Sequence, residues 1–341
     1  MLFEKAIVKK FREAICQRYD PDGTIFYYSP EDLGLLYTEF NFKGDHGQIL
    51  RGYFYGDGIM KPDRLIIFEH GMGCGHRAYL REIATIVNEG YQVFAYDHTG
   101  TLASEGTDIG GFSQSLSDLD HALRAIKASY WFLNQKITVI GHSWGGFSTL
   151  NIPAYHPDID SVVAISGYVS VYEMLRSILG PMKIYSDALL RAEAEKFGAY
   201  SYADARYSLS LSSTHALIVH SKDDSVCPFS HFELLRSTLG EKEGVLFLEC
   251  DKKDHNPNYT RLAIIEKAKF FKALAKMKKQ KKLSTDEEKA AFLGEWDFAK
   301  ITEQDKLFWE KVFDFIDPGR HIMDELEGFG VILESETPFL S

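Results

Sequence analysis

The sequence has few cysteines, no excess of positive charge and no long apolar run. Its four cysteines, Cys16, Cys74, Cys227 and Cys250, are scattered through 341 residues without a C-x-x-C pair. This spacing argues against a disulfide framework and is typical of a protein of the reducing cytoplasm, where we expect this one. No apolar run approaches membrane-spanning length, and charges interrupt the N-terminus before a signal peptide could form. We therefore expect no membrane insertion.

The charge balance excludes another class of partner. Lysine and arginine total 38 against 49 acidic residues, a net charge of −11, which argues against a nucleic-acid-binding surface. Most of this charge lies in one place, because residues 283–341 hold 15 acidic and 5 basic residues. The length allows one large α/β domain with additions, or two domains.

The apolar pattern predicts an α/β fold with a mostly parallel sheet. Residues 3–16 read as an amphipathic helix, and residues 36–54 as a β-hairpin with a turn at Gly44–Gly47. After Pro62, short and nearly continuous apolar strands alternate with helical segments, which is typical of a parallel sheet covered by helices on both faces. The predicted strands are Leu65–Phe68, Gln92–Tyr96, Ile137–Ile140, Val162–Ile165, Ala216–Val219 and Val245–Leu248.

The chain is organised around the motif Gly141-His142-Ser143-Trp144-Gly145. A β-branched run precedes it and a helix-compatible stretch follows it, so the serine lies at a tight strand-to-helix turn. In such a turn the serine backbone is strained, and the flanking glycines let strand and helix approach closely. Ser143 is therefore the candidate nucleophile.

Two later strands end in loops that carry a candidate acid and base. Asp223 and Asp224 follow the strand ending at Val219, and His255 follows the strand ending at Leu248. Since sites in open α/β sheets form at the carboxyl ends of the strands, these loops can converge on Ser143. His255 would take the hydroxyl proton of Ser143 and an aspartate would orient the imidazole. Asp224 is favoured over Asp223 because of its spacing to Val226 and Pro228.

The loop from Glu69 to Gly75 is rich in glycine and can turn backbone amides into a site. Acyl transfer needs two such donors for the developing oxyanion, and we expect the amides of Met72 and Trp144 to supply them. His70, Cys74 and His76 in the same loop could also be read as metal ligands, but H-x3-C-x-H is no established site. We expect neither a metal nor a cofactor.

Taken together, these motifs resemble the α/β-hydrolase superfamily, especially the branch of carboxylesterases, monoacylglycerol lipases and serine-aminopeptidase-like hydrolases. The resemblance spans residues 33–282 and implies Ser143, Asp224 and His255 as the catalytic triad, with Met72 and Trp144 as oxyanion donors. Two features depart from the family: His98 stands where an arginine is usual, and Gly100–Ser104 replaces a G-x-G-x-S motif. A serine at the elbow disfavours haloalkane dehalogenase and epoxide hydrolase chemistry.

The resemblance also predicts how the chain is divided. Residues 1–32 form an N-terminal helical segment, residues 33–282 the hydrolase core, and residues 283–341 an acidic helical extension that packs against the body or a second copy of the chain. An insertion at 168–214 resembles a cap over the acyl pocket, which Tyr168 and Tyr172 could line. Three arginines of the cap could meet a substrate carboxylate, although surface positions suit them better: Arg176, Arg191 and Arg206.

Three functions are compatible with these observations. The first is a serine hydrolase that cleaves a carboxylic ester with a small acyl or lipid-like group through an acyl-enzyme. The second is an acyltransferase or thioesterase that uses the same three residues. The third is a non-catalytic binding module on a hydrolase scaffold, against which the complete set of triad residues argues.

Overall fold

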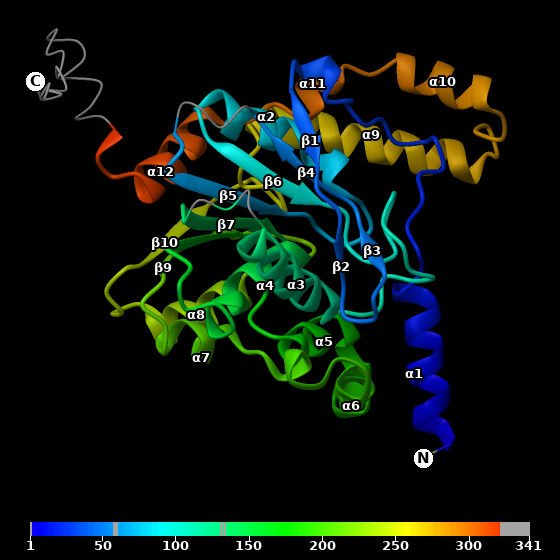
Figure 1. Ribbon diagram of the computed structural model, residues 1–341. Coiled ribbons are helices and arrows are strands. Elements are labelled where there is room, and N and C mark those ends of the chain that lie inside the picture. The colour runs from blue at the N-terminus through cyan, green and yellow to red at the C-terminus, as the bar shows by residue number, and fades with distance from the viewer. Residues whose placement is uncertain (1, 57–60, 130–131, 133, 321–341) are drawn as a thin grey trace, which may run out of the picture.

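The computed structural model describes residues 2–56, 61–129, 132 and 134–320, and an eight-stranded sheet lies at its centre (Figure 1). The strand order is β1-β4-β6-β5-β7-β8-β9-β10. β4 pairs antiparallel with both β1 and β6, and the remaining neighbours, from β6 to β10, pair in parallel. The strands span β1 Tyr37–Glu39, β4 Gly52–Tyr55, β5 Arg64–Glu69, β6 Gln92–Tyr96, β7 Lys136–His142, β8 Ser161–Ile165, β9 His215–Ser221 and β10 Val245–Cys250. The predicted, mostly parallel sheet is confirmed.

The predicted hairpin is confirmed, with one interruption. β1 pairs with β4, and the ends of the two strands nearest the turn form a separate ribbon of β2 (Phe42–Lys43) and β3 (Ile49–Leu50). At the junction the ring of Phe94 and the carbonyl of Phe40 fill the space beside Gly52, so that a Cβ there would lie 2.5 Å from the ring. Glycine is therefore needed at position 52, where β4 pairs with β6.

Side chains alternate between the two faces of the sheet, and helices cover both. Leu65 and Ile67 face one apolar cluster, whereas Ile66 and Phe68 face the other. The first cluster is covered by α3 (Gln114–Ala128), α4 (Trp144–Asn151), α7 (Ala205–Ser210) and α8 (Ser230–Leu239). The second is covered by α2 (Leu80–Asn88) and α12 (Lys306–Ile316), on the opposite side of the sheet in Figure 1.

The C-terminal helices belong to the packed body. Trp309 and Phe313 of α12 are buried in the second cluster, where each aromatic side chain contributes about 1.5–3 kcal/mol by leaving water. α12 lies in the expected C-terminal extension and completes one face of the sheet, so this part of the extension packs against the body. A third cluster joins α9 (Arg261–Lys279), α10 (Asp286–Gly294) and α11 (Phe298–Ile301). Residues 321–341 of the extension lie outside the described residues.

Polar side chains cap two of the C-terminal helices. Thr285 and Glu288 form a capping box at the start of α10. The carboxylate of Asp305 accepts the amides of Leu307 and Phe308 at the start of α12. By contrast, Phe229 precedes α8 and makes no side-chain cap bond.

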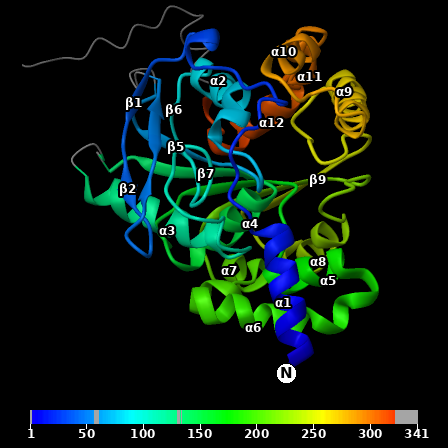
Figure 2. The same ribbon diagram turned by 90° about the vertical axis from the view of Figure 1, so that its right-hand side faces the viewer.

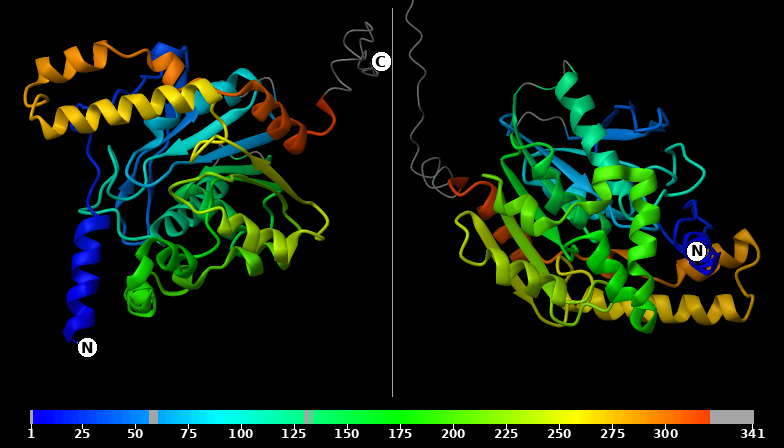
Figure 3. Two further views of the ribbon diagram at one scale, coloured as in Figure 1. Left: turned by 180° about the vertical axis from the view of Figure 1, so that it is seen from behind. Right: turned by 90° about the horizontal axis from the view of Figure 1, so that it is seen from below.

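The cap insertion and the N-terminal helix lie on the same side of the sheet (Figures 2 and 3). The insertion at 168–214, called the cap below, holds α5 (Val171–Leu179) and α6 (Ser186–Phe197). α1 (Leu2–Ile15) packs Val8, Phe11 and Ile15 against the first cluster. Short 3-10 segments span Glu31–Leu33, His76–Tyr79, Ile152–Ala154, Gly180–Tyr185 and Gly198–Tyr202. Of the helices in the described part of the chain, none has the length and apolarity to cross a membrane.

Candidate active site

Ser143 lies at the sharp turn between β7 and α4. Its backbone is strained, with φ 57° and ψ −114°, and its amide donates to the carbonyl of Ile165 on the neighbouring strand at 2.9 Å. The motif glycines are required by packing, because a Cβ on Gly141 would lie 2.2 Å from Thr149 and one on Gly145 would lie 2.3 Å from the Glu69 carbonyl. The sequence motif thus builds the predicted elbow.

His255 and Asp224 are in direct contact. His255 lies in the loop after β10 and Asp224 in the loop after β9, and His255 Nδ1 is 2.8 and 3.0 Å from the two carboxylate oxygens. The amides of Val226 and Cys227 also donate to Asp224, at 2.9 and 2.8 Å. Asp223 instead points to Ser221 and the Lys253 amide. The structure therefore brings Asp224, and not Asp223, to the histidine.

The surroundings of Asp224 keep it ionised. Burial alone would raise its pKa, but contacts with His220 and His255 outweigh burial and hold the pKa below its usual range. His220 Nε2 lies 3.2 Å from the carboxylate while it also contacts the carbonyl of Cys227. A buried negative charge is thus fixed behind the ring of His255, where it can stabilise an imidazolium.

Ser143 and His255 face the same cavity. No hydrogen bond joins their side chains among those found for the described residues; the Ser143 hydroxyl interacts with the buried thiol of Cys227. Catalytic hydrogen bonds are often long without substrate and tighten when it binds. His255 uses Nδ1 for Asp224, which leaves Nε2 for the cavity side.

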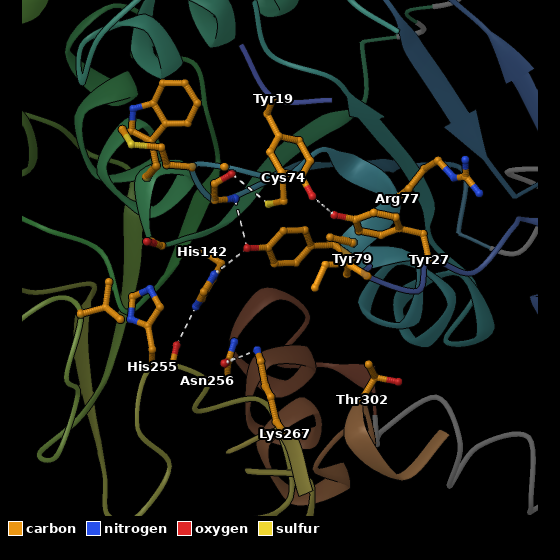
Figure 4. A pocket seen from close by; sticks show the side chains of 18 of the residues that line it. Tyr19, Tyr27, Cys74, Arg77, Tyr79, His142, His255, Asn256, Lys267 and Thr302 are labelled. Carbon is orange, nitrogen blue, oxygen red and sulfur yellow. Dashed lines mark hydrogen bonds between the residues drawn. The ribbon is translucent and has the colours of Figure 1, made fainter. Parts of the chain in front are cut away.

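A chain of hydrogen bonds ties the glycine-rich loop to the histidine loop (Figure 4). The Gly71 amide donates to Tyr79 Oη at 3.1 Å, and Tyr79 Oη lies 2.8 Å from His142 Nδ1. His142 Nε2 lies 2.7 Å from the His255 carbonyl, so a neutral His142 with its proton on Nε2 satisfies the whole chain. Burial and the charge of His255 lower the pKa of His142 well below its usual value, in agreement with that state.

The residues of the two expected oxyanion donors, Met72 and Trp144, line the same cavity as Ser143. Met72 follows Gly71, whose Cβ position is 3.5 Å from Ser143 Cβ, and both residues line the cavity. Trp144 is the first residue of α4, so helix geometry leaves its amide without an acceptor in the helix. The indole of Trp144 is buried and donates to the Phe112 carbonyl at 2.7 Å.

His98 lies between two buried carboxylates beside the site. Its Nδ1 is 3.2 Å from Asp118 and its Nε2 is 3.3 Å from Glu69, the latter an ion pair without hydrogen-bond geometry. Burial opposes the charge of His98, but the two carboxylates raise its pKa to about 9. The rings of His70 and Trp144 pack against it. His98 is therefore a buried cation that supports the loop and the elbow.

The stability of the protein should fall in mild alkali because of His98. Its folded-state pKa of about 9 exceeds the usual 6.5, so its stabilisation is complete below pH 6.5 and is lost as the pH rises through 9. A shift of this size corresponds to roughly 3 kcal/mol. Between pH 6 and 10 the melting temperature of the wild type should fall more steeply with pH than that of His98→Gln. An equal fall in both proteins would contradict the assignment of His98 as a buried cation.

The cavity extends far beyond Ser143. Its volume is about 770 Å³, and its walls come from residues 19–28, the loop and helix at 71–81, the cap, α9 and α11. Tyr168 lines the cavity as expected and stacks on Phe147, with ring centroids 4.8 Å apart. Tyr172 is not among the described residues that line it, and its hydroxyl accepts from Arg176 instead.

Several residues of the cavity were not found from the sequence. The N-terminal segment at 19–28 and the aromatic residues of α9 and α11 form its distal wall. Lys267 also lines the cavity, on the same stripe of α9 as the buried residues Ala263, Phe270 and Leu274. A lysine on the apolar stripe of a helix was the sequence signal that could have identified it.

The cap arginines do not line this cavity. Arg206 pairs with Asp204 at 2.6 Å and Arg191 lies 3.5 Å from Glu4, while Arg176 contacts Tyr172. Among the residues of the described ranges, no cluster of three or more histidine, cysteine or acidic side chains is arranged to hold a metal ion. The charged groups of the cavity therefore come from other elements.

Comparisons with known proteins agree with this architecture. Residues 60–192 match the hydrolase family described as serine aminopeptidase, S33. The uncharacterized protein YfhR of Escherichia coli K12 is 26% identical over 242 residues, which are 70% of this chain and 79% of the relative. Esterase YjfP of the same organism is 24% identical over 199 residues, 55% of this chain and 80% of the relative.

Solved structures share the fold at low sequence identity. The Pyrococcus furiosus esterase Pf2001 is 18% identical and superposes with a TM-score of 0.55, covering 75% of this chain and 96% of its own. Est1E from Butyrivibrio proteoclasticus, solved with ferulic acid, is 17% identical with a TM-score of 0.52, covering 69% of this chain and 98% of its own. These likenesses concern the fold.

Proposed function

This chain is a member of the α/β-hydrolase superfamily, and on that premise we propose that it is a serine hydrolase that cleaves a carboxylic ester through an acyl-enzyme. The observation that carries the proposal is the placement of Ser143 at a strained elbow, in one cavity with a histidine that a buried, ionised aspartate orients. Strain at an isolated serine, without a base and an acid beside it, would not support catalysis.

In the proposed mechanism each of these groups has a role in the first half-reaction. His255 Nε2 takes the proton of Ser143 Oγ as the oxygen attacks the ester carbonyl, and Asp224 stabilises the imidazolium that results. The amides of Met72 and Trp144 donate to the carbonyl oxygen, which becomes negative in the tetrahedral intermediate. His255 then gives its proton to the leaving alcohol, and the acyl group stays on Ser143.

The second half-reaction repeats these steps with water. His255 removes a proton from a water molecule, the hydroxide attacks the acyl carbonyl, and the same two amides stabilise the second tetrahedral intermediate. Collapse breaks the bond to Ser143 Oγ, which recovers its proton from His255, and the carboxylic acid leaves. The hydrogen bonds that run from the Gly71 amide through Tyr79 and His142 to the His255 carbonyl link the glycine-rich loop to the histidine loop. We expect them to hold the oxyanion donor and the base at a fixed distance during both half-reactions.

Labelling of the purified wild type tests the proposal. A fluorophosphonate should modify one serine, and peptide mass spectrometry should locate the label at Ser143, because only an activated hydroxyl reacts at neutral pH. The same preparation should hydrolyse p-nitrophenyl esters with a definite chain-length optimum. A folded protein that neither takes the label nor hydrolyses any ester would refute the hydrolase function and favour a binding module.

A further inference from the structure

The charged side chains that line the cavity are all positive. Arg77, Arg81 and Lys267 lie on its wall, and no aspartate or glutamate is among the described residues that line it. The whole protein has 49 acidic and 38 basic residues, so the cavity reverses the overall balance. Electrostatic complementarity of this kind favours a negatively charged ligand over a neutral one.

Lys267 brings its charge close to the catalytic histidine. Its Nζ donates to Asn256 Oδ1 at 2.7 Å and lies 4.9 Å from the centre of the Tyr259 ring. Asn256 directly follows His255, and Figure 4 shows the lysine reaching from α9 toward it. An ammonium has three donors, so the bond to Asn256 leaves two for another partner.

The protein compensates this charge only partly. Among the described residues no carboxylate lies within ion-pair distance of Lys267, and Glu82 and Asp254 act on it only through space. Burial lowers the pKa of Lys267, because removal from water disfavours the charged form of the amine. Glu82 is itself buried outside the cavity wall, and burial raises its pKa. Charges that leave water are normally paired in proteins, so the half-buried ammonium of Lys267 can take an anionic partner from a ligand.

Arg81 offers a second cation on the same wall. Its guanidinium lies over the Tyr28 ring, 5.7 Å from the centroid, and its Nε is buried without a hydrogen-bond partner. Aromatic side chains of residues 26–28, α9 and α11 form the rest of the distal wall. The cavity thus combines an apolar interior with unpaired cationic donors, which suits an amphipathic anion.

We propose that the ester substrate carries a carboxylate on an apolar body, and that Lys267 holds the carboxylate while the ester carbonyl lies at Ser143. This inference rests on the proposed hydrolase function. The apolar body lies against the aromatic wall, and the carboxylate completes the pairing of the lysine. Neutral esters of equal size lose this charge-assisted hydrogen bond and leave the cation unpaired.

Two matched pairs of esters test the proposal. The first is a series of mono-p-nitrophenyl esters of straight-chain dicarboxylic acids, compared with the same compounds methylated at the free carboxylate. The second is 4-acetoxybenzoate compared with its methyl ester, which moves the charge to the alcohol part. The wild type should prefer the carboxylate member of at least one pair by roughly ten- to hundredfold in kcat/KM, the range of a charge-assisted hydrogen bond.

Variants of α9 test whether Lys267 causes the preference for the carboxylate ester. Lys267→Gln should abolish this preference, and Lys267→Arg should retain a large part of it. Lys272→Gln, which removes an exposed charge from the same helix, should keep the wild-type ratio. Fluorophosphonate labelling of each variant shows that the elbow is intact.

The outcomes separate the two hypotheses. Equal kcat/KM for carboxylate and methyl ester in both wild-type pairs overturns the anionic substrate while leaving ester hydrolysis in place. A preference that persists in Lys267→Gln overturns the role of Lys267. The absence of both labelling and hydrolysis in the wild type overturns the hydrolase function and this inference with it.

Discussion

Replacing Ser143 by alanine should abolish ester hydrolysis and fluorophosphonate labelling together. The substitution removes only the attacking oxygen, and serine hydrolases lose roughly 10⁶-fold in kcat when the nucleophile is deleted. The fold should survive, because the contacts that shape the turn come from the backbone: the Ser143 amide bonds to the Ile165 carbonyl, and Phe147 donates to the Ser143 carbonyl. The measurement is the rate of p-nitrophenol release, with thermal unfolding as a check on the fold.

Ser237→Ala is the matched control for this result. Ser237 lies on the exposed face of α8 and donates only to the Leu234 carbonyl, so its loss should change neither the rate nor the labelling. A Ser143→Ala protein that keeps more than about a thousandth of the wild-type rate would argue for another nucleophile, since oxyanion donors and binding alone give only a small residual rate.

The elbow and the loops around it could be predicted from the sequence because each depends on local chemistry. Gly141 and Gly145 are needed where backbone atoms approach within van der Waals contact, and this requirement leaves a readable motif. His255 and Asp224 follow strands whose apolar runs are unambiguous, and the carboxyl ends of parallel strands meet at one edge. The motif and the strand pattern were therefore enough to predict that Ser143, Asp224 and His255, which are far apart in the sequence, lie at the same edge of the sheet.

The distal cavity could not be predicted because it depends on how remote segments pack. Residues 19–28 carry no periodic pattern, and their role follows only from contact with α9 and α11, as in the stacking of Phe26 on Phe298 at 4.6 Å. The sequence left open whether the C-terminal extension packs on the body or on a second copy of the chain, since an amphipathic helix does not specify its partner. The sequence also could not separate Tyr168, which lines the cavity, from Tyr172, which contacts Arg176, because it does not reveal which side of a helix faces a cavity.

Replacing Asp224 by asparagine should reduce kcat by roughly 10⁴-fold. The asparagine keeps the size of the side chain but removes the charge that stabilises the His255 imidazolium, and its amide nitrogen can hold the imidazole in the wrong tautomer. The contacts with His220 and His255 hold the pKa of Asp224 below its usual range, so the wild-type residue stays ionised at the pH of ordinary assays. The loss should therefore be present across the neutral range, measured as kcat on the best p-nitrophenyl ester.

Asp223→Asn provides the comparison that distinguishes the two adjacent aspartates. Asp223 is exposed and bonds to Ser221 and the Lys253 amide, away from the imidazole, so its replacement should change kcat by only a few fold at most. A larger loss from Asp223→Asn than from Asp224→Asn would reverse the assignment. Equal and small losses in both would mean that neither carboxylate supports the histidine in the transition state, and that the contact of 2.8 Å between His255 Nδ1 and Asp224 serves structure alone.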